Sequence, residues 1–359
     1  MFKQLQINAL ADHPDYAESS VASCFSKQPL GYIDIGARGG AHDIVFGLAR
    51  LTAVLGFEPD NEECCRLLAD MEIKKPWSCF ELEAVALSRA EEEVTLHLLS
   101  DPNNHSLLPP NDKFLSRYNM QKWVEIGSKK INAVTLDSIL FGKRKYQTQW
   151  GEFIKLDTQG SEFNILEGSS RVLRERCVAA VIEVSFCELY KDQKLFSDIE
   201  KIMREHGFSF YGFMPIHSRS CKLLNKHTHI TAERALYSDA IFFKDPLDGR
   251  KDVKLSIRQN YVLFTIAVLL NFYDFALELA RKTWLNDASA QEKLLIERLI
   301  SDLSEYPVTQ SIKDAEELAK QVARRPDLAN FFIGNFVDRR RKVCNFDDVL
   351  NISPLPRML

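Results

Sequence analysis

Acidic and basic side chains gather in the segment WGEFIKLDTQGSEFNILEG, which spans residues 150–168. Alternation along a strand would place Lys155 and Asp157 on the same face, at the strand's carboxyl end. Glu162 follows two residues after the next glycine, and Glu183 stands near the end of the following apolar segment. A carboxylate within hydrogen-bond reach of a hydroxyl can remove its proton, so these four residues are the candidate catalytic group, with Asp157 first.

Other roles for the same residues stay open. Lys155 would be the base if burial lowered its pKa, and a magnesium ion held by Asp157, Glu162 and Glu183 would be a second-ranked aid. Lys155 and Asp157 would otherwise form a structural ion pair, with Glu162 stabilising the first turn of a helix. We therefore assign no residue as a metal ligand.

A glycine-rich turn follows the apolar segment YIDIGARGG, residues 32–40. Glycine allows a ligand to approach the backbone closely, so Gly36, Ala37 and Gly39 are candidate cofactor contacts. Asp34 places a carboxylate beside this turn. That charge would repel a dinucleotide pyrophosphate and attract the ammonium and sulfonium groups of S-adenosylmethionine.

Two further segments complete the predicted cofactor site. Glu58 ends the next apolar segment, 22 positions after Gly36, where an acid can accept hydrogen bonds from ribose hydroxyls. Ala84 lies in the segment CFELEAVALS, whose small residues would leave room for an adenine ring. Asp157 would border the same site, because ligands of open α/β sheets bind at the carboxyl ends of the strands.

Seven apolar segments separated by stretches with helical spacing would position these residues. This alternation is typical of a doubly wound α/β fold. The predicted strands are 32–37, 53–57, 79–87, 153–157, 179–184, 208–213 and 240–243. Helices are expected at 42–50, 61–71 and 195–207, and the alternating strand 92–99 precedes a turn-rich hairpin or lid.

The chain changes character after Lys244, where DPLDGRKD predicts a linker over residues 245–252. Helices are expected at 257–282, as one or two, and at 290–303 and 311–323. The expected organisation is therefore a segment 1–29, a catalytic domain 30–244, the linker, and a helical region 253–359. That region is a candidate contact surface for a homo-oligomer.

Composition excludes several other classes of protein. The 359 residues carry a formal charge of -4, which gives no general attraction to nucleic acid, and the basic run at 339–342 is expected to be solvated. The longest apolar stretch, 261–270, is about half the length that spans a bilayer. Eight cysteines without a zinc or disulfide pattern, and no export signal at the N-terminus, predict a cytoplasmic protein.

Six segments together resemble the FkbM-type methyltransferases, a class I family that uses S-adenosylmethionine. They are YIDIGARGG, GFEPD, EAVALS, NAVTLDSIL, EFIKLDTQGSEFNILEG and IEVSFCELYKDQKLF, over about residues 30–244. The resemblance implies a mostly parallel seven-stranded Rossmann-like sheet, with the cofactor held by Asp34, Gly36 and Glu58. The glycine segment departs from the usual acid-x-G-x-G-x-G pattern, which puts the contacts of residues 38–40 in doubt.

The same resemblance implies transfer of a methyl group to a hydroxyl of a sugar, glycan, sugar nucleotide or secondary metabolite. Two rival functions keep the α/β sheet. One is a binding module without catalysis, and the other is a nicotinamide-dependent oxidoreductase or epimerase. Asp34 and the lack of a G-x-G-x-x-G motif weigh against the nicotinamide cofactor.

Overall fold

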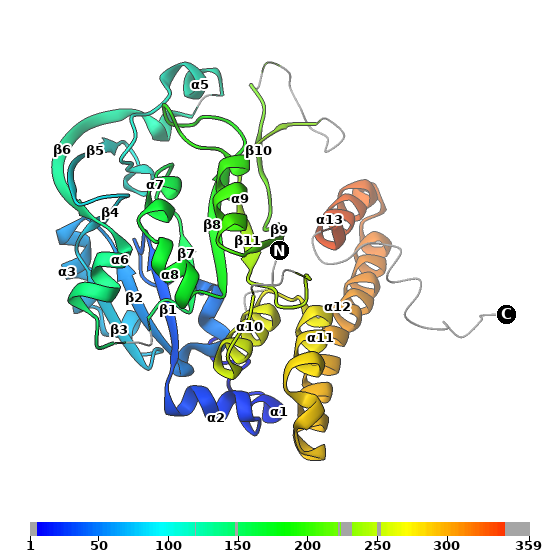
Figure 1. The fold of residues 1–359 in the computed structure, drawn as a ribbon. Coiled ribbons are helices and arrows are strands. Elements are labelled where there is room, and N and C mark those ends of the chain that lie inside the picture. Colours follow the sequence, from blue (N-terminus) through cyan, green and yellow to red (C-terminus); the bar gives the residue numbers. More distant parts are fainter. Residues whose placement is uncertain are drawn as a thin grey trace.

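The computed structural model describes residues 6–118, 120–147, 150–221, 223, 232–249 and 253–341. Its centre is a twisted sheet with helices on both faces (Figure 1). Strands run in the order β3 (Cys79–Glu83), β2 (Thr52–Phe57), β1 (Leu30–Ile35), β7 (Phe153–Leu156), β8 (Ala179–Ser185) and β11 (Arg234–Phe243), and both β9 (Ser209–Phe213) and β10 (His217–Arg219) pair with β11. The pairs from β3 to β8 are parallel, and β11 is antiparallel to its neighbours. The predicted doubly wound, mostly parallel α/β fold is confirmed, with β10 as an eighth strand.

Each of the seven predicted strand segments contains a strand of this sheet, but the segment 79–87 is divided. It leaves the central sheet after Glu83 and enters a second sheet as β4 (Ala86–Leu87). That sheet has the order β4, β6 (Glu125–Val134), β5 (Glu92–Leu99). The alternating strand 92–99 was predicted, whereas β6 was not, because most of its side chains are exposed and its sequence lacks an apolar period.

Two hydrophobic cores cover the two faces of the central sheet. One includes α7 (Glu162–Glu167), α8 (Ser170–Glu175) and α9 (Phe196–Glu205). The other includes α1 (Pro14–Ala17), α2 (Ser20–Lys27), the 3-10 segment η1 (Asp43–Leu51) and α10 (Ile257–Leu269). An α-helix was expected at 42–50, and the structure corrects this to η1, where Leu48 takes a non-helical backbone conformation directly after Gly47.

Shorter helices connect these elements. They are α3 (Asn61–Ala69), α4 (Met71–Lys74), η2 (Pro102–Asn104), α5 (Asp112–Arg117), η3 (Gln121–Trp123), α6 (Leu136–Ser138) and the π-helical turn η4 (Ile139–Lys143). The helices α3 and α9 agree with the expected segments 61–71 and 195–207. Within the described residues, no helix combines the length and the apolar composition needed to cross a bilayer.

The C-terminal region begins with α10 and α11 (Tyr273–Thr283), followed by η5 (Leu285–Asp287), α12 (Ala290–Arg324), η6 (Pro326–Leu328) and α13 (Ala329–Arg341). Segment 257–282 is therefore two helices, separated at Asn271, whose φ is 64°. The two helices expected at 290–303 and 311–323 are one, since α12 continues through both. Residues 250–252 of the predicted linker, and Lys342 of the basic run, lie outside the described residues.

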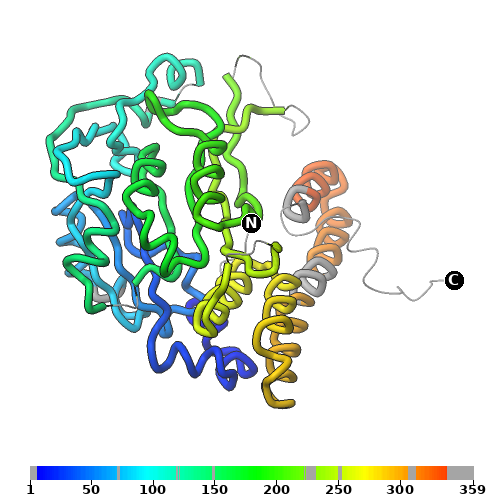
Figure 2. The backbone as a smooth tube through the Cα atoms, viewed as in Figure 1, coloured from blue at the N-terminus to red at the C-terminus, as the bar shows by residue number. Residues whose placement is uncertain are grey.

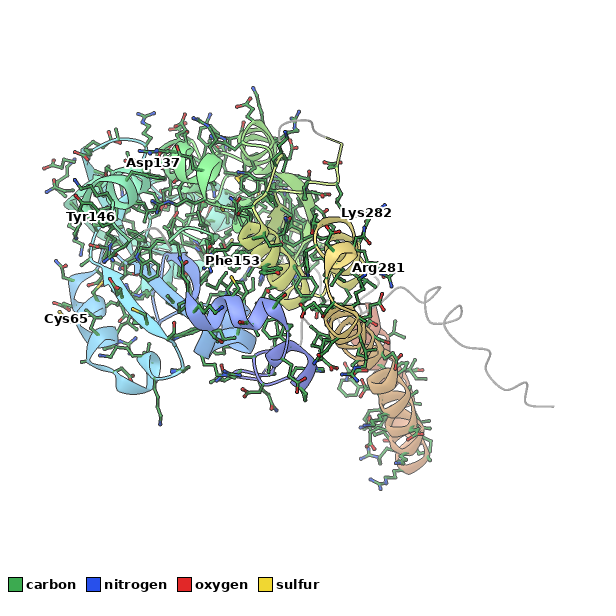
Figure 3. The ribbon with its side chains drawn as sticks, turned by 60° about the horizontal axis from the view of Figure 1, so that its bottom comes forward. Cys65, Asp137, Tyr146, Phe153, Arg281 and Lys282 are labelled. Carbon is green, nitrogen blue, oxygen red and sulfur yellow. The ribbon has the colours of Figure 1, made fainter. Side chains whose placement is uncertain are left out.

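The first helix of this region, α10, packs against the central sheet. Arg258 of α10 donates to both carboxylate oxygens of Glu152, at 2.6 and 2.9 Å, and Glu152 also accepts from the backbone of Gly31. Figure 2 shows the chain passing from the sheet through α10 and α11 into α12. Phe153 of β7 lies inside the body, whereas Arg281 and Lys282 of α11 lie at its surface, and the helices beyond extend outward (Figure 3). The division into domains stays a prediction.

Candidate active site

A cleft lies at the carboxyl ends of β1, β2 and β7, as the strand order requires for an open α/β sheet. It encloses about 670 Å³, part of it open to solvent. Three of the predicted site residues line it, namely Gly36, Glu58 and Asp157. The segment 102–107, within the stretch expected to form a hairpin or lid, covers one side, and we call these six residues the lid segment.

Gly36 directly follows β1 and lies between the end of β2 and the end of β7. Its φ is +88°, and a Cβ built there would lie 1.9 Å from the backbone oxygen of Asp157. The amides of Gly36 and Ala37 both donate to the oxygen of Phe57 on β2. The side chain of Ala37 is buried beside this contact. The amide of Gly39 donates to the carboxylate of Glu63 on α3 at 3.0 Å. Among the described residues that line the cleft, neither Ala37 nor Gly39 is found.

Asp34 has a different environment from the one expected. Its buried carboxylate accepts a hydrogen bond of 2.7 Å from the backbone amide of His42, and so closes the glycine turn on itself. Burial raises the pKa of Asp34, although the His42 amide opposes the shift. The described residues of the cleft lining do not include it. Direct contact between Asp34 and a cofactor therefore remains a prediction, and the structure supports a role in shaping the turn.

Glu58 ends β2 with its carboxylate at the cleft. Its Oε1 accepts from the amide of Asp60 at 2.9 Å and lies 3.9 Å from Nη1 of Arg38, while among the described residues none donates a hydrogen bond to Oε2. Burial raises the pKa of Glu58, partly offset by the Asp60 amide and by Arg38. Arg38 also donates to Asp60 at 3.3 Å. One oxygen of Glu58 is thus held while the other can accept from a ligand.

The apolar side of the cleft is formed by the chain between the two sheets. Val85, Ala86 and Leu87 line it, together with Phe57. Ala84 is exposed and is not among the described lining residues. The turn after Glu83 shifts the alternation of side chains, so the neighbours of Ala84 take the place that was predicted for it.

The lid segment is tied to the loop after β7. The hydroxyl of Ser106 donates to the backbone oxygen of Gln159 at 2.6 Å. His105 also lines the cleft, and its Nδ1 accepts from the amide of Leu99 at 3.1 Å. Burial and the nearby Arg38 lower the pKa of His105, which favours the neutral imidazole.

Lys155 lies at the centre of the predicted catalytic group. Its buried Nζ is 2.8 Å from Oδ1 of Asp239 and 3.5 Å from Oδ2 of Asp157. Burial alone would lower the pKa of Lys155, but the carboxylates of Asp157 and Asp239 outweigh it and the pKa is raised. The condition for Lys155 to be the base is therefore not met. Its proton stays in place, and Asp239, which the sequence did not indicate, completes the ion pair.

Asp157 follows β7 and Glu183 lies two residues before the end of the adjacent strand β8, and both accept hydrogen bonds from the side chain of Gln159, at 2.9 and 3.0 Å. Burial raises the pKa of Asp157, but Lys155 and Gln159 outweigh it and the pKa is lowered. The pKa of Glu183 is raised well above its usual value, because of burial and the neighbouring carboxylates. Asp157 is therefore the member of the pair that ionises readily, and Glu183 is the member that holds a proton readily.

Glu162 closes the turn after β7. Its carboxylate accepts from the amides of Thr158 at 2.8 Å and Gly160 at 3.0 Å, and burial raises its pKa. One oxygen each of Asp157, Glu162 and Glu183 lies within 4.8 Å of the others. Both oxygens of Glu162 already accept hydrogen bonds from backbone amides. This arrangement supports a structural role for Glu162 in holding the turn.

Residues 34–210 match the family model of the methyltransferase FkbM domain. This chain is an FkbM-type methyltransferase. The family and the enzyme class expected from the sequence are thereby confirmed. No curated protein matches the chain.

Solved structures give a more distant likeness. The methyltransferase FkbM from Methylobacillus flagellatus KT is 16% identical, with a TM-score of 0.35, and the match covers 60% of this chain and 43% of that one. The magnesium protoporphyrin IX methyltransferase of Synechocystis PCC 6803 is 10% identical, covering 63% and 78% at a TM-score of 0.30. Streptococcus pneumoniae Sp1610, a putative tRNA (m1A22) methyltransferase, is 11% identical, covering 80% and 99% at 0.29. At these values the likenesses say nothing of substrate.

Proposed function

We propose that this methyltransferase transfers a methyl group from S-adenosylmethionine to a hydroxyl of a sugar, glycan, sugar nucleotide or secondary metabolite. One observation carries the proposal. A single cleft brings together a glycine that must lack a side chain, a carboxylate with an open oxygen, an apolar wall and a second carboxylate, which are Gly36, Glu58, residues 85–87 and Asp157.

These features fit S-adenosylmethionine. Glu58 would accept from the ribose hydroxyls, and Val85, Ala86 and Leu87 would contact the adenine ring. Gly36 lacks a side chain because the backbone of Asp157 lies against it, and its own backbone lines the cleft, where it would meet the amino-acid part of the cofactor, with Asp157 beside the positive charge. When bound, the cofactor supplies a methyl group on a positively charged sulfur.

The chain's own residues would hold the acceptor and take its proton. Asp157 or Glu183 accepts the hydrogen of the acceptor O–H as the new O–C bond forms and the C–S bond breaks, leaving S-adenosylhomocysteine and the methyl ether. Lys155 keeps Asp157 ionised for this purpose. Positioning the oxygen at about 3 to 3.5 Å from the methyl carbon supplies much of the acceleration. Magnesium assistance stays second-ranked, and EDTA treatment tests it.

Isothermal titration calorimetry with S-adenosylmethionine tests the cofactor. We expect binding by the wild type, about 100-fold weaker binding by Glu58→Ala, since hydrogen bonds to a charged group are lost, and unchanged binding by Glu62→Ala, an exposed acid nearby on α3. Binding of NAD in place of S-adenosylmethionine would instead support the oxidoreductase, and binding of neither would support a module without catalysis.

Transfer from methyl-labelled S-adenosylmethionine then tests the acceptor. Pools of glycans, sugar nucleotides and polyketides are incubated with the enzyme, and the products are analysed by mass spectrometry. A mass gain of one methyl group that survives mild base supports an ether, while label on nitrogen or carbon contradicts O-methylation. A cytoplasmic location and assembly through the helical region remain predictions.

A further inference from the structure

Gln159 has an uncommon backbone conformation for a residue with a side chain. Its φ is 58°, it stands two residues after Asp157 and directly before Gly160, and it lines the cleft. Residues other than glycine, asparagine and aspartate rarely take this conformation, and where they do the surrounding contacts hold them there. The contacts of Gln159 therefore indicate what the conformation achieves.

The amide group of Gln159 bridges the two candidate bases. Its Nε2 donates to Oδ1 of Asp157 at 2.9 Å and to Oε2 of Glu183 at 3.0 Å, which uses both of its hydrogens. Its Oε1 accepts from the hydroxyl of Tyr190 at 3.2 Å. A neutral amide between the two side chains holds them close together and adds no further charge to the pair.

The same residue also holds the lid segment. The backbone oxygen of Gln159 accepts from the hydroxyl of Ser106 at 2.6 Å. The single hydroxyl hydrogen of Tyr190 is shared between Oε1 of Gln159 and the backbone oxygen of Asn104, which lies 3.0 Å from the hydroxyl. Asn104 and Ser106 stand on either side of His105, which lines the cleft. One arm of this connection is the backbone of Gln159, and the other runs from its side chain through Tyr190.

We propose that Gln159 is a positioning residue that couples closure of the lid segment to the placement of the Asp157 and Glu183 carboxylates. The inference rests on the proposed function in one respect only, that this pair faces the charged part of the cofactor. Other titratable or charged groups around the pair lie on every neighbouring element: Lys155 on β7, Glu162 on α7, Tyr190 after β8, and Tyr237 and Asp239 on β11. These groups are unchanged in the variants below, except Tyr190 where it is named.

The test removes the amide without straining the backbone. Gln159→Gly suits the left-handed φ, and Gln159→Glu keeps the size of the side chain but replaces the amide donor. Gln291→Ala, on the exposed surface of α12, is the matched control. Circular dichroism confirms the fold of each variant. Dissociation constants for S-adenosylmethionine and S-adenosylhomocysteine are then measured at pH 6 and pH 8.

Without the bridging donor the pair binds protons more tightly, because Gln159 helps to lower the pKa of Asp157, and at pH 6 it loses attraction for the sulfonium charge. In Gln159→Gly we expect the ratio of the S-adenosylmethionine dissociation constants at pH 6 and pH 8 to be about tenfold larger than in the wild type, corresponding to one pKa unit. S-adenosylhomocysteine, whose sulfur is neutral, should show a smaller change. If Gln159→Glu and Gln159→Gly both keep the wild-type ratio, the amide does not act on the carboxylates and the proposal is wrong.

Hydrogen exchange of the lid segment tests the other half, without any cofactor. Tyr190→Phe and Ser106→Ala should each speed amide exchange in the lid segment about tenfold or more. Gln159→Gly should lower the protection factors of the same amides by an amount that changes with pH, whereas the wild-type protection factors should not change with pH. Exchange unchanged in Gln159→Gly would refute the coupling. A wild type that exchanges as expected but binds no S-adenosylmethionine would instead refute the proposed function.

Discussion

The two ends of the cleft hold their carboxylates in different ways. At the β2 end, one oxygen of Glu58 accepts from a backbone amide, and Arg38 lies at the longer distance of 3.9 Å. At the β7 end, Asp157 has partners within the protein on both oxygens, from Gln159 at 2.9 Å and Lys155 at 3.5 Å. The first end keeps capacity for a ligand, while the second is arranged before a ligand arrives.

This difference separates recognition from chemistry. A carboxylate that must grip a ribose needs an open oxygen, because its hydrogen bonds form only with the ligand. A carboxylate that must face a reacting hydroxyl gains from fixed geometry, because positioning contributes more than binding strength to the rate. Substitutions at the β2 end should therefore change affinity, and those at the β7 end should change stability and pH dependence.

The largest expected effect comes from the residue that joins the two ends. Gly36→Ala places a Cβ against the backbone of Asp157 and imposes a side chain on a φ of +88°. Overpacking and strain should together lower the free energy of unfolding by roughly 4 kcal/mol. Urea denaturation measures it. Gly39→Ala is the control, since its φ is +86° but nothing lies within 4 Å of the added Cβ, so only about 1 kcal/mol should be lost.

Removal of the buried cation should follow in size. Lys155→Met leaves Asp157 and Asp239 without their shared partner, and breaking a buried ion pair costs about 3 kcal/mol. Lys143→Met is the control, because Lys143 pairs with Glu83 from the surface, where Arg144 also contacts the same carboxylate. That change should cost under about 1 kcal/mol. If both variants lost the same free energy of unfolding, the carboxylates at the β7 end would not depend on a buried partner more than Glu83 does.

The sequence predicted well what depends on local pattern. Apolar runs located every parallel strand of the central sheet, and the alternation of strand and helix predicted its doubly wound class, though not the order of the strands. Gly36, Glu58 and Asp157 line the cleft because each follows directly after a strand, where position in the sequence determines position at the sheet edge.

Contacts between distant segments were not visible in the sequence. Asp239 lies on an antiparallel strand, and its pairing opposite Glu183 depends on a register that only the folded sheet defines. The role of Gln159 could not be predicted, because an amide in a turn has no characteristic pattern and its partner Glu183 comes from a different strand. Asp34 was assigned from its charge and from the family resemblance, and the hydrogen bond from His42 that occupies it arises from the path of the turn.

Replacing the charge at the β2 end should change affinity without changing the fold. Glu58→Gln keeps the shape but weakens acceptance from the ribose, and we expect about 30-fold weaker binding of S-adenosylmethionine, or about 2 kcal/mol. Burial raises the pKa of Glu58, so wild-type affinity should fall as the pH drops through that raised value. The variant should lack this part of the pH dependence. Calorimetry between pH 5 and pH 8 checks both, and an equal pH profile would contradict the role of Glu58.

The prediction with the smallest expected effect concerns Glu183, and it tests whether the carboxylates at the β7 end are held in place before a ligand binds. Because the pKa of Glu183 is raised in the folded chain, the folded state binds a proton more readily than the unfolded state, and stability from this group falls as the pH rises from its ordinary pKa through the raised one. Glu183→Gln removes that loss. It should match the wild type near pH 4 and exceed it by about 1 kcal/mol at pH 8 in urea denaturation. The exposed Glu188→Gln should show no such divergence. A constant offset at every pH would mean that Glu183 has the same pKa in the folded and unfolded chain, which would contradict the raised pKa and the arrangement of this pair.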